Sequence, residues 1–148
     1  MKNMKNMKKI ISMVPMLVGV LMAQNGPLAN GVYAVEEDNA KAKNPVVRRY
    51  EGKNVVLDTA AFAPLLIQGR PEINRDPRGS SLMIQLAPEA AKRLEDLTRS
   101  HMNRRIAVVV DDKILSAPKV RRVIEDGKAR LTPCEDESCD TLLRQLSK

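Results

Sequence analysis

The sequence has very few aromatic side chains. Its 148 residues include no Trp, one Phe (Phe62) and two Tyr (Tyr33 and Tyr50). Proteins that bind single-stranded nucleic acid stack the bases on aromatic rings, so the composition argues against nucleic acid as a partner. The core must be built from aliphatic side chains instead.

Histidine is almost as scarce, because His101 is the only one. Hydrolytic chemistry needs a nucleophile, a base and an orienting group, and no such set can be assembled around His101. We interpret it as a structural histidine near the end of a helix, and we predict a protein that is not an enzyme and needs no cofactor. A pocket that brought His101 together with Asp111 and Asp112 would favour an enzyme.

Only two cysteines are present, Cys134 and Cys139, with four residues between them. Zinc sites generally use shorter cysteine spacings and need two further ligands, so no metal is predicted. In an exported protein the pair favours a disulfide; the alternative is a buried Cys139 and a free thiol at Cys134. We interpret the nearby acids as stabilising the start of a helix rather than as a cation site: Glu135, Asp136, Glu137 and Asp140.

The charge is unevenly distributed. The net charge is +7, but residues 1–34 carry four lysines and no acid. The remaining residues have 21 basic and 18 acidic side chains, a balance of +3, which is ordinary for a soluble domain. The composition alone therefore does not indicate a polyanion partner.

The amino-terminal residues have the pattern of an export signal. Lysines between Lys2 and Lys9 precede an apolar stretch over residues 10–23. A 14-residue helix spans ~21 Å, short of the ~30 Å hydrocarbon core of a membrane. We predict a signal peptide over residues 1–34, cleaved after Ala34 or, as a second option, after Ala23. The mature chain is then periplasmic or extracellular without a stable membrane span; an uncleaved anchor is the alternative.

The remainder is predicted to be a flexible charged leader over residues 35–54 and one α+β domain over residues 55–148. Alternation predicts a strand at 82–86, and helical periodicity after Pro88 predicts a helix that ends before a left-handed Asn103. A β-branched run around Asp111-Asp112 predicts a hairpin. We expect a small, mainly antiparallel sheet with helices packed on one face, from these elements in order: strand 55–57, helix 60–67, strand 82–86, helix 88–102, strands 106–110 and 113–116, a helical turn at 120–124, strand 128–132 and helix 139–146.

One part of the sequence resembles a known family. Leu97-Thr98 is followed by the run Asn103 to Asp111 (NRRIAVVVD) and by Lys113 to Pro118 (KILSAP). This ordered string is similar to the periplasmic P1 head subdomain of the SecD/SecDF protein-export membrane proteins. The resemblance implies an α+β head that contacts a translocating preprotein outside the membrane. The sequence departs from the family at four positions where the family has glycine. These positions are occupied by Asn103, Asp112, Asp126 and Pro133.

The leading hypothesis is a non-enzymatic exported domain that binds polypeptide, either unfolded exported chains or an envelope protein. An exposed sheet edge could accept an additional strand. The predicted binding residues are Arg104, Arg105, Lys113, Ile114, Leu115, Ser116, Ala117 and Pro118.

The alternative is a structural or interaction module of the cell envelope. Three arginine pairs could then dock an anionic lipid or polymer. They are Arg48-Arg49, Arg104-Arg105 and Arg121-Arg122.

Overall fold

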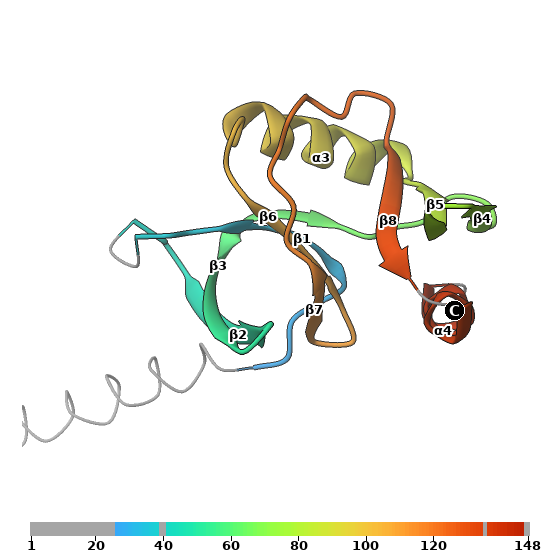
Figure 1. Ribbon diagram of the computed structural model, residues 1–148. Coiled ribbons are helices and arrows are strands. Elements are labelled where there is room, and N and C mark those ends of the chain that lie inside the picture. Colours follow the sequence, from blue (N-terminus) through green and yellow to red (C-terminus); the bar gives the residue numbers. More distant parts are fainter. Residues whose placement is uncertain (1–25, 39–40, 135, 147–148) are drawn as a thin grey trace, which may run out of the picture.

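The computed structural model describes residues 26–38, 41–134 and 136–146, without the side chains of residues 132–138. This part of the chain contains eight strands and two helices, arranged as in Figure 1. Their bounds are β1 Gly31–Val35, β2 Pro45–Tyr50, β3 Lys53–Pro64, β4 Glu72–Asp76, β5 Gly79–Gln85, α3 Pro88–Ser100, β6 Ile106–Val110, β7 Lys113–Ser116, β8 Lys128–Cys134 and α4 Asp136–Leu146.

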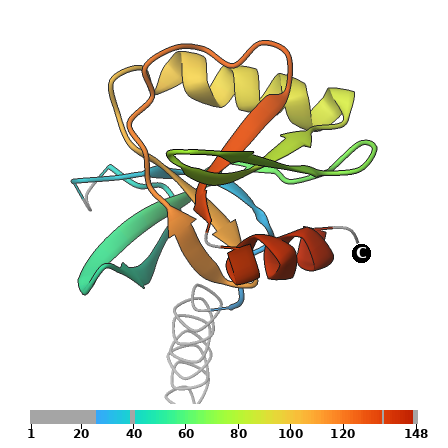
Figure 2. The ribbon, with the colours of Figure 1, turned by 45° about the vertical axis from the view of Figure 1, so that its right-hand side comes forward.

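The strands form two antiparallel sheets. The larger one has the order β2-β3-β1-β6-β7, and the smaller has the order β4-β5-β8. The larger sheet is strongly curled, so that its two outer strands, β2 and β7, approach each other (Figures 1 and 2). The chain thus forms an α+β domain with a mainly antiparallel arrangement, as predicted.

The curl has a local cause in β3. Tyr33 of β1 lies opposite Phe62, but the next residue, Ala34, lies opposite Asp58, so residues 59–61 are extra on the β3 side. The Asp58 carboxylate accepts a hydrogen bond from the Ala60 amide at 2.9 Å within this bulge. Extra residues bend a strand and increase its twist. This bulge therefore helps β3 to turn the sheet on itself.

Both faces of the larger sheet are buried. Along β1, Val32 and Ala34 contact one hydrophobic cluster, while Tyr33 and Val35 contact another on the opposite face. This follows from the alternation of side chains along a strand. The first cluster is closed by leucines of α3, α4 and the smaller sheet, and the second fills the inside of the curl, where Tyr33 stacks on Phe62 at a ring-centroid distance of 4.6 Å.

Most elements after residue 80 are where the sequence predicts them. The strand, the helix after Pro88, the β6–β7 hairpin, the strand after Lys128 and the terminal helix are all confirmed. Asn103 has the predicted left-handed backbone, with φ of 62°. Asp111 and Asp112 also have positive φ, 51° and 64°, as the tight two-residue turn requires.

The predicted organisation of the first 54 residues is wrong where the structure describes it. Residues 31–34, assigned to the signal peptide, form the central strand β1 together with Val35, hydrogen-bonded between β3 and β6. The leader over residues 35–54 contains β2 and the start of β3, joined by Glu51-Gly52, both with positive φ. The sequence of β2 is polar and rich in arginine, which is typical of a disordered segment. It is polar because β2 lies at the edge of the sheet and buries mainly Val46. Residues 1–25 lie outside the described part.

Two smaller predictions are also wrong. Residues 60–64 continue β3 instead of forming a helix, because pairing with β1 outweighs the helical preference of their alanines. Residues 120–124 form no helical turn but an irregular segment, whose Ile124 amide is hydrogen-bonded to Thr98 of α3.

Candidate functional site

The predicted binding edge lies at an edge of the larger sheet. β7 pairs with β6 on one side, and within the described residues no strand pairs with its other side. The pairing shifts register so that Leu115 is an extra residue between Ile114, opposite Val109, and Ser116, opposite Val108. A bulged strand of four residues is typical of a protected edge.

The side chains of this edge divide between core and surface. Ile114 is buried in the cluster inside the curl, so it serves packing and its side chain is not open to a partner. Leu115 is 39% exposed, and Lys113 and Pro118 are exposed as well. Ser116 and Ala117 are partly buried.

The tip of the hairpin is tied to two other segments through Asp112. Its carboxylate accepts hydrogen bonds from the Leu28 amide at 2.8 Å and from Arg48 Nη2 at 2.8 Å. These hydrogen bonds hold the pKa of Asp112 below its usual value, the Leu28 amide contributing most. Arg48 also donates to the Gly26 carbonyl at 3.0 Å. The β2 and β7 ends of the curled sheet are therefore joined here. The Ala117 carbonyl accepts from Arg105 and the Pro118 carbonyl from the Ile106 amide, so the open part of the edge is at Leu115 and Ser116.

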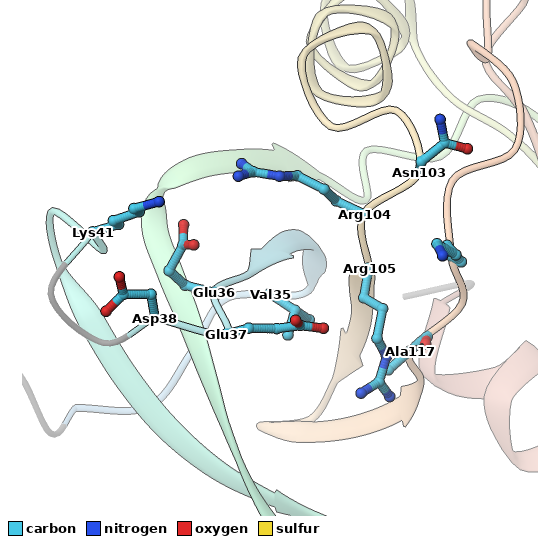
Figure 3. A pocket seen from close by; sticks show the side chains of 10 residues that line it. Val35, Glu36, Glu37, Asp38, Lys41, Asn103, Arg104, Arg105 and Ala117 are labelled. Atoms are coloured by element: carbon cyan, nitrogen blue, oxygen red, sulfur yellow. Dashed lines mark hydrogen bonds between the residues drawn. The ribbon is translucent and has the colours of Figure 1, made fainter.

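Arg104 and Arg105 lie beyond the other end of the edge and line a charged cavity of about 630 Å³. Three acidic residues, Glu36, Glu37 and Asp38, line the same cavity (Figure 3). In Figure 3 the side chain of Arg104 extends across the opening toward the acidic segment. Arg105 instead donates from Nε to the Ala117 carbonyl at 3.1 Å. The cavity thus has both signs of charge. Lys41 and Lys119 are further cations in its lining, and Lys41 lies beside the acidic segment (Figure 3).

The acidic side of this cavity was missed in the sequence because residues 36–38 were assigned to a flexible leader. Their position depends on β1, since the Glu36 amide donates to the Val56 carbonyl at 2.9 Å and the Val35 amide to the Arg105 carbonyl at 3.1 Å. The continuous apolar run from Val32 to Val35 is the signal that could have revealed a strand buried on both faces.

The groups considered for an enzyme are not brought together. His101 ends α3, where its Nδ1 lies 2.8 Å from the Leu97 carbonyl oxygen. Asp111 and Asp112 are at the opposite end of β6, about 17 Å along a five-residue strand. The pocket that would have favoured an enzyme is therefore not formed. In the part of the chain that the structure describes, no group of three or more potential ligands could hold a metal ion.

The cysteine prediction concerns β8 and α4. Cys139 is fully buried on α4, and the backbone of Cys134 pairs with Ser80. The side chain of Cys134 lies outside the described residues, as do those of Asp136 and Glu137. The disulfide therefore stays a prediction.

Comparison with known proteins decides the family. The sequence model of the SecDF P1 head subdomain matches residues 42–146, which include β2 through α4. The chain belongs to the SecDF P1 head family. The resemblance of the NRRIAVVVD and KILSAP runs is thereby confirmed.

Two curated relatives illustrate the extent of the likeness. The protein translocase subunit SecDF of Thermus thermophilus is 27% identical over 106 residues, covering 68% of this chain. The protein translocase subunit SecD of Thermobaculum terrenum is 30% identical over 81 residues, covering 55% of it. The matches span only 14% and 16% of the relatives' lengths.

Solved structures show the same fold. The crystal structure of SecDF in its super-membrane-facing form superposes with a TM-score of 0.56 at 22% identity, over 79% of this chain and 18% of that one. A second, described as a membrane component SecDF that enhances protein export, has a TM-score of 0.50 at 16% identity and is covered over 92% of its length. Across the described residues of this P1 head, no helix is long and apolar enough to cross a membrane.

Proposed function

We propose that this P1 head is an exported, non-enzymatic domain that binds extended polypeptide at the open edge of β7. The observation that carries the proposal is the placement of the SecD-like run 113–118 at a sheet edge without a second strand in the described part of the chain. An extended segment of another chain can add to such an edge through main-chain hydrogen bonds.

The chemistry of the edge supports weak and sequence-tolerant binding. Leu115 offers one exposed apolar contact, while main-chain groups recognise any sequence. The strand is short and bulged, which disfavours the long, stable pairing that leads to aggregation. Such an edge suits a partner that must be released again, as an exported chain must.

The relatives support the same function. They are described as protein translocase subunits, and one solved neighbour is described as enhancing protein export. The proposed location outside the cytoplasmic membrane follows from the export-signal pattern of residues 1–23. The proposed partner is an unfolded exported chain or an envelope protein.

The mixed charges of the cavity near Arg104 favour polypeptide over a polyanion at this end of the edge. Its cations face three carboxylates, Glu36, Glu37 and Asp38, and these would repel an anionic polymer. A passing polypeptide carries both signs of charge and can be accommodated.

The test uses the full chain and a permanently unfolded model protein, whose tryptophans can be excited selectively because this sequence has none. We expect saturable binding by fluorescence anisotropy. Leu115→Lys should weaken it roughly five- to tenfold, about 1 kcal/mol, because an apolar contact at the edge is lost.

Leu66→Lys is the matched control, since Leu66 is 50% exposed and lies outside β7. It should leave the affinity unchanged. A folded chain that does not bind the unfolded protein, or equal losses in the two variants, would exclude β7 as the binding edge.

A further inference from the structure

The three arginine pairs differ in what surrounds them. Arg48 is held by Asp112, and Arg49 donates to the Gly52 carbonyl at 3.1 Å. The second pair, Arg104-Arg105, lines the cavity that also contains three carboxylates. Within the described residues, no ion pair joins Arg121 or Arg122 to a carboxylate. Among the described residues, this third pair therefore lies outside the ion pair of Arg48 and the cavity of the three carboxylates.

Arg121 and Arg122 lie at a second cavity, of about 310 Å³. Its inner wall belongs to the main hydrophobic cluster, between the irregular segment 117–127 and the layer formed by α3, β6 and β8. The apolar residues that line this wall include Val32, Leu65, Leu94, Ile106, Val108 and Leu131.

The rim of this cavity has a single sign of charge. Among its described lining residues there are five cations and no carboxylate. All five side chains are exposed, so they keep their charge in contact with water. In the described part of the chain, Arg130 is the one of the five in an ion pair, with its Nη2 3.5 Å from Asp76 Oδ2. Glu125 and Asp126 lie outside this cavity, in an adjoining one that Arg122, Lys128 and Arg130 also line. The cations are Lys119, Arg121, Arg122, Lys128 and Arg130.

The segment that forms the rim is anchored on both sides of the arginine pair. The Val120 amide donates to the Arg104 carbonyl at 2.8 Å, and the Ile124 amide donates to Thr98 Oγ1 at 3.0 Å. Val120 is buried, so the two arginines are held at the surface with apolar residues on either side. The cationic rim is therefore fixed to the fold at the mouth of the cavity.

We propose that this cavity binds a single-chain anionic amphiphile, with its alkyl chain against the apolar wall and its phosphate or carboxylate head at the arginine pair. The volume is at the low end of the ~300–1,000 Å³ typical of ligand pockets, which suits one chain better than two. Arginine is the side chain best suited to phosphate and carboxylate heads, through paired hydrogen bonds.

A polypeptide is the less favoured occupant. An apolar side chain would fill the cavity but would bring no negative charge to the arginine pair Arg121-Arg122, whereas the amphiphile fills the cavity and also places an anion there. This proposal is independent of binding at β7, because the cavity and the β7 edge share only Pro118.

The experiment titrates the full chain with dodecyl phosphate below its micelle-forming concentration and follows the backbone amide NMR signals. We expect saturable shifts at Ile124 and Leu131, which line the cavity. Arg121→Glu with Arg122→Glu should weaken binding roughly tenfold or more at low salt, because two attractive charges become repulsive. Arg75→Glu with Arg78→Glu is the matched control, with the same change in net charge on the exposed β4–β5 hairpin, and it should have little effect.

Other probes separate the two parts of the site. Dodecyl maltoside, which is neutral, and inorganic phosphate, which has no chain, should each bind at least tenfold more weakly. Ala129→Leu narrows the cavity and should weaken dodecyl phosphate binding while the arginine pair is intact. Three outcomes would each overturn the proposal. The first is an equal loss of dodecyl phosphate affinity in the two charge-reversed variants. The others are binding of dodecyl maltoside or inorganic phosphate as tightly as dodecyl phosphate, and displacement of dodecyl phosphate by an unfolded polypeptide.

Discussion

At the scale of single residues, Asp112 joins three segments that are far apart in the sequence. Its carboxylate accepts hydrogen bonds from Leu28 and Arg48 while its backbone turns the β6–β7 hairpin. The side chain is 43% exposed, so solvent screens the ion pair and its contribution to stability is modest. The sequence predicts the turn, because two adjacent aspartates between β-branched runs are turn formers. It cannot predict the Leu28 and Arg48 contacts, which depend on the curl of the whole sheet.

Asp112 should make the stability sensitive to acid. The pKa of its carboxyl is lower in the folded chain than its unfolded value of about 3.9. Its stabilisation is therefore complete above that unfolded value and is lost as the pH falls toward the folded pKa. Asp112→Asn should lower the melting temperature at pH 6 but reduce the further loss between pH 5 and pH 2.5. Thermal unfolding followed by circular dichroism across this range measures both effects.

Asp111→Asn provides the comparison for this experiment. Asp111 is exposed in the same turn and also has a positive φ, which asparagine tolerates. Its variant should keep the acid sensitivity of the parent chain. If the two variants have the same pH profile, the carboxylate of Asp112 does not carry the effect.

Gly31 shows another residue whose role depends on tertiary structure. A Cβ atom there would overlap the ring of Phe62 and would lie 2.8 Å from the Ala63 carbonyl oxygen. The glycine thus permits Phe62 to lie over β1 and stack on Tyr33. The sequence alone does not indicate this role for Gly31, because the glycine lies within the predicted signal peptide.

At the scale of elements, periodicity predicts those with a strong local pattern. Helix α3 has Ala90, Leu94 and Leu97 buried at helical spacing behind a proline at its start. The β2–β3 hairpin has a weaker pattern, because its Glu51-Gly52 turn is flanked by polar residues. The edge position of β7 can be predicted from the hairpin and the family resemblance. The cavity lined by residues 36–38 cannot, because it forms only when β1 pairs with its neighbouring strands.

The segment 117–127 is hydrogen-bonded to α3 through the hydroxyl group of Thr98. Thr98 is fully buried, and its Oγ1 accepts from the Ile124 amide at 3.0 Å while donating to the Leu94 carbonyl at 2.9 Å. Thr98→Val preserves the shape but leaves the Ile124 amide without this acceptor. We expect a loss of about 1–3 kcal/mol in the free energy of unfolding, measured by urea denaturation.

Thr141→Val on the exposed face of α4 tests whether the change of residue type matters by itself. It should alter the free energy of unfolding by no more than about 0.5 kcal/mol. Hydrogen exchange at Ile124 should accelerate in Thr98→Val only. Unchanged exchange there would show that this hydrogen bond does not hold the segment.

At the scale of the whole molecule, the first residues of the domain are the part that sequence reasoning misplaced. Val32-Tyr33-Ala34 fits the pattern of a cleavage site, and the apolar run from Val32 to Val35 equally fits a strand buried on both faces. The two interpretations can be separated only by the fold, because the partners of β1 are β3 and β6, the latter more than 70 residues away. A pairing over that separation leaves nothing in the local sequence that identifies the partner strand.

The fold therefore predicts where an export signal can be removed. Cleavage after Ala34 would remove nearly all of β1, which buries Val32, Tyr33 and Ala34 and joins β3 to β6. It would also remove the Gly26 carbonyl that accepts from Arg48 and the Leu28 amide that donates to Asp112. We expect cleavage after Ala23 instead, giving a mature chain that begins at Gln24.

Intact mass and amino-terminal sequencing of the exported protein measure this directly. Ala23→Asp should block processing, because a charged residue replaces the small one before the cut. Ala34→Asp should leave the cleavage position unchanged but destabilise the domain, since it buries a charge in the central strand. A mature chain that begins at Val35 and remains folded would show that β1 is dispensable, and it would contradict the central place of this strand in the sheet.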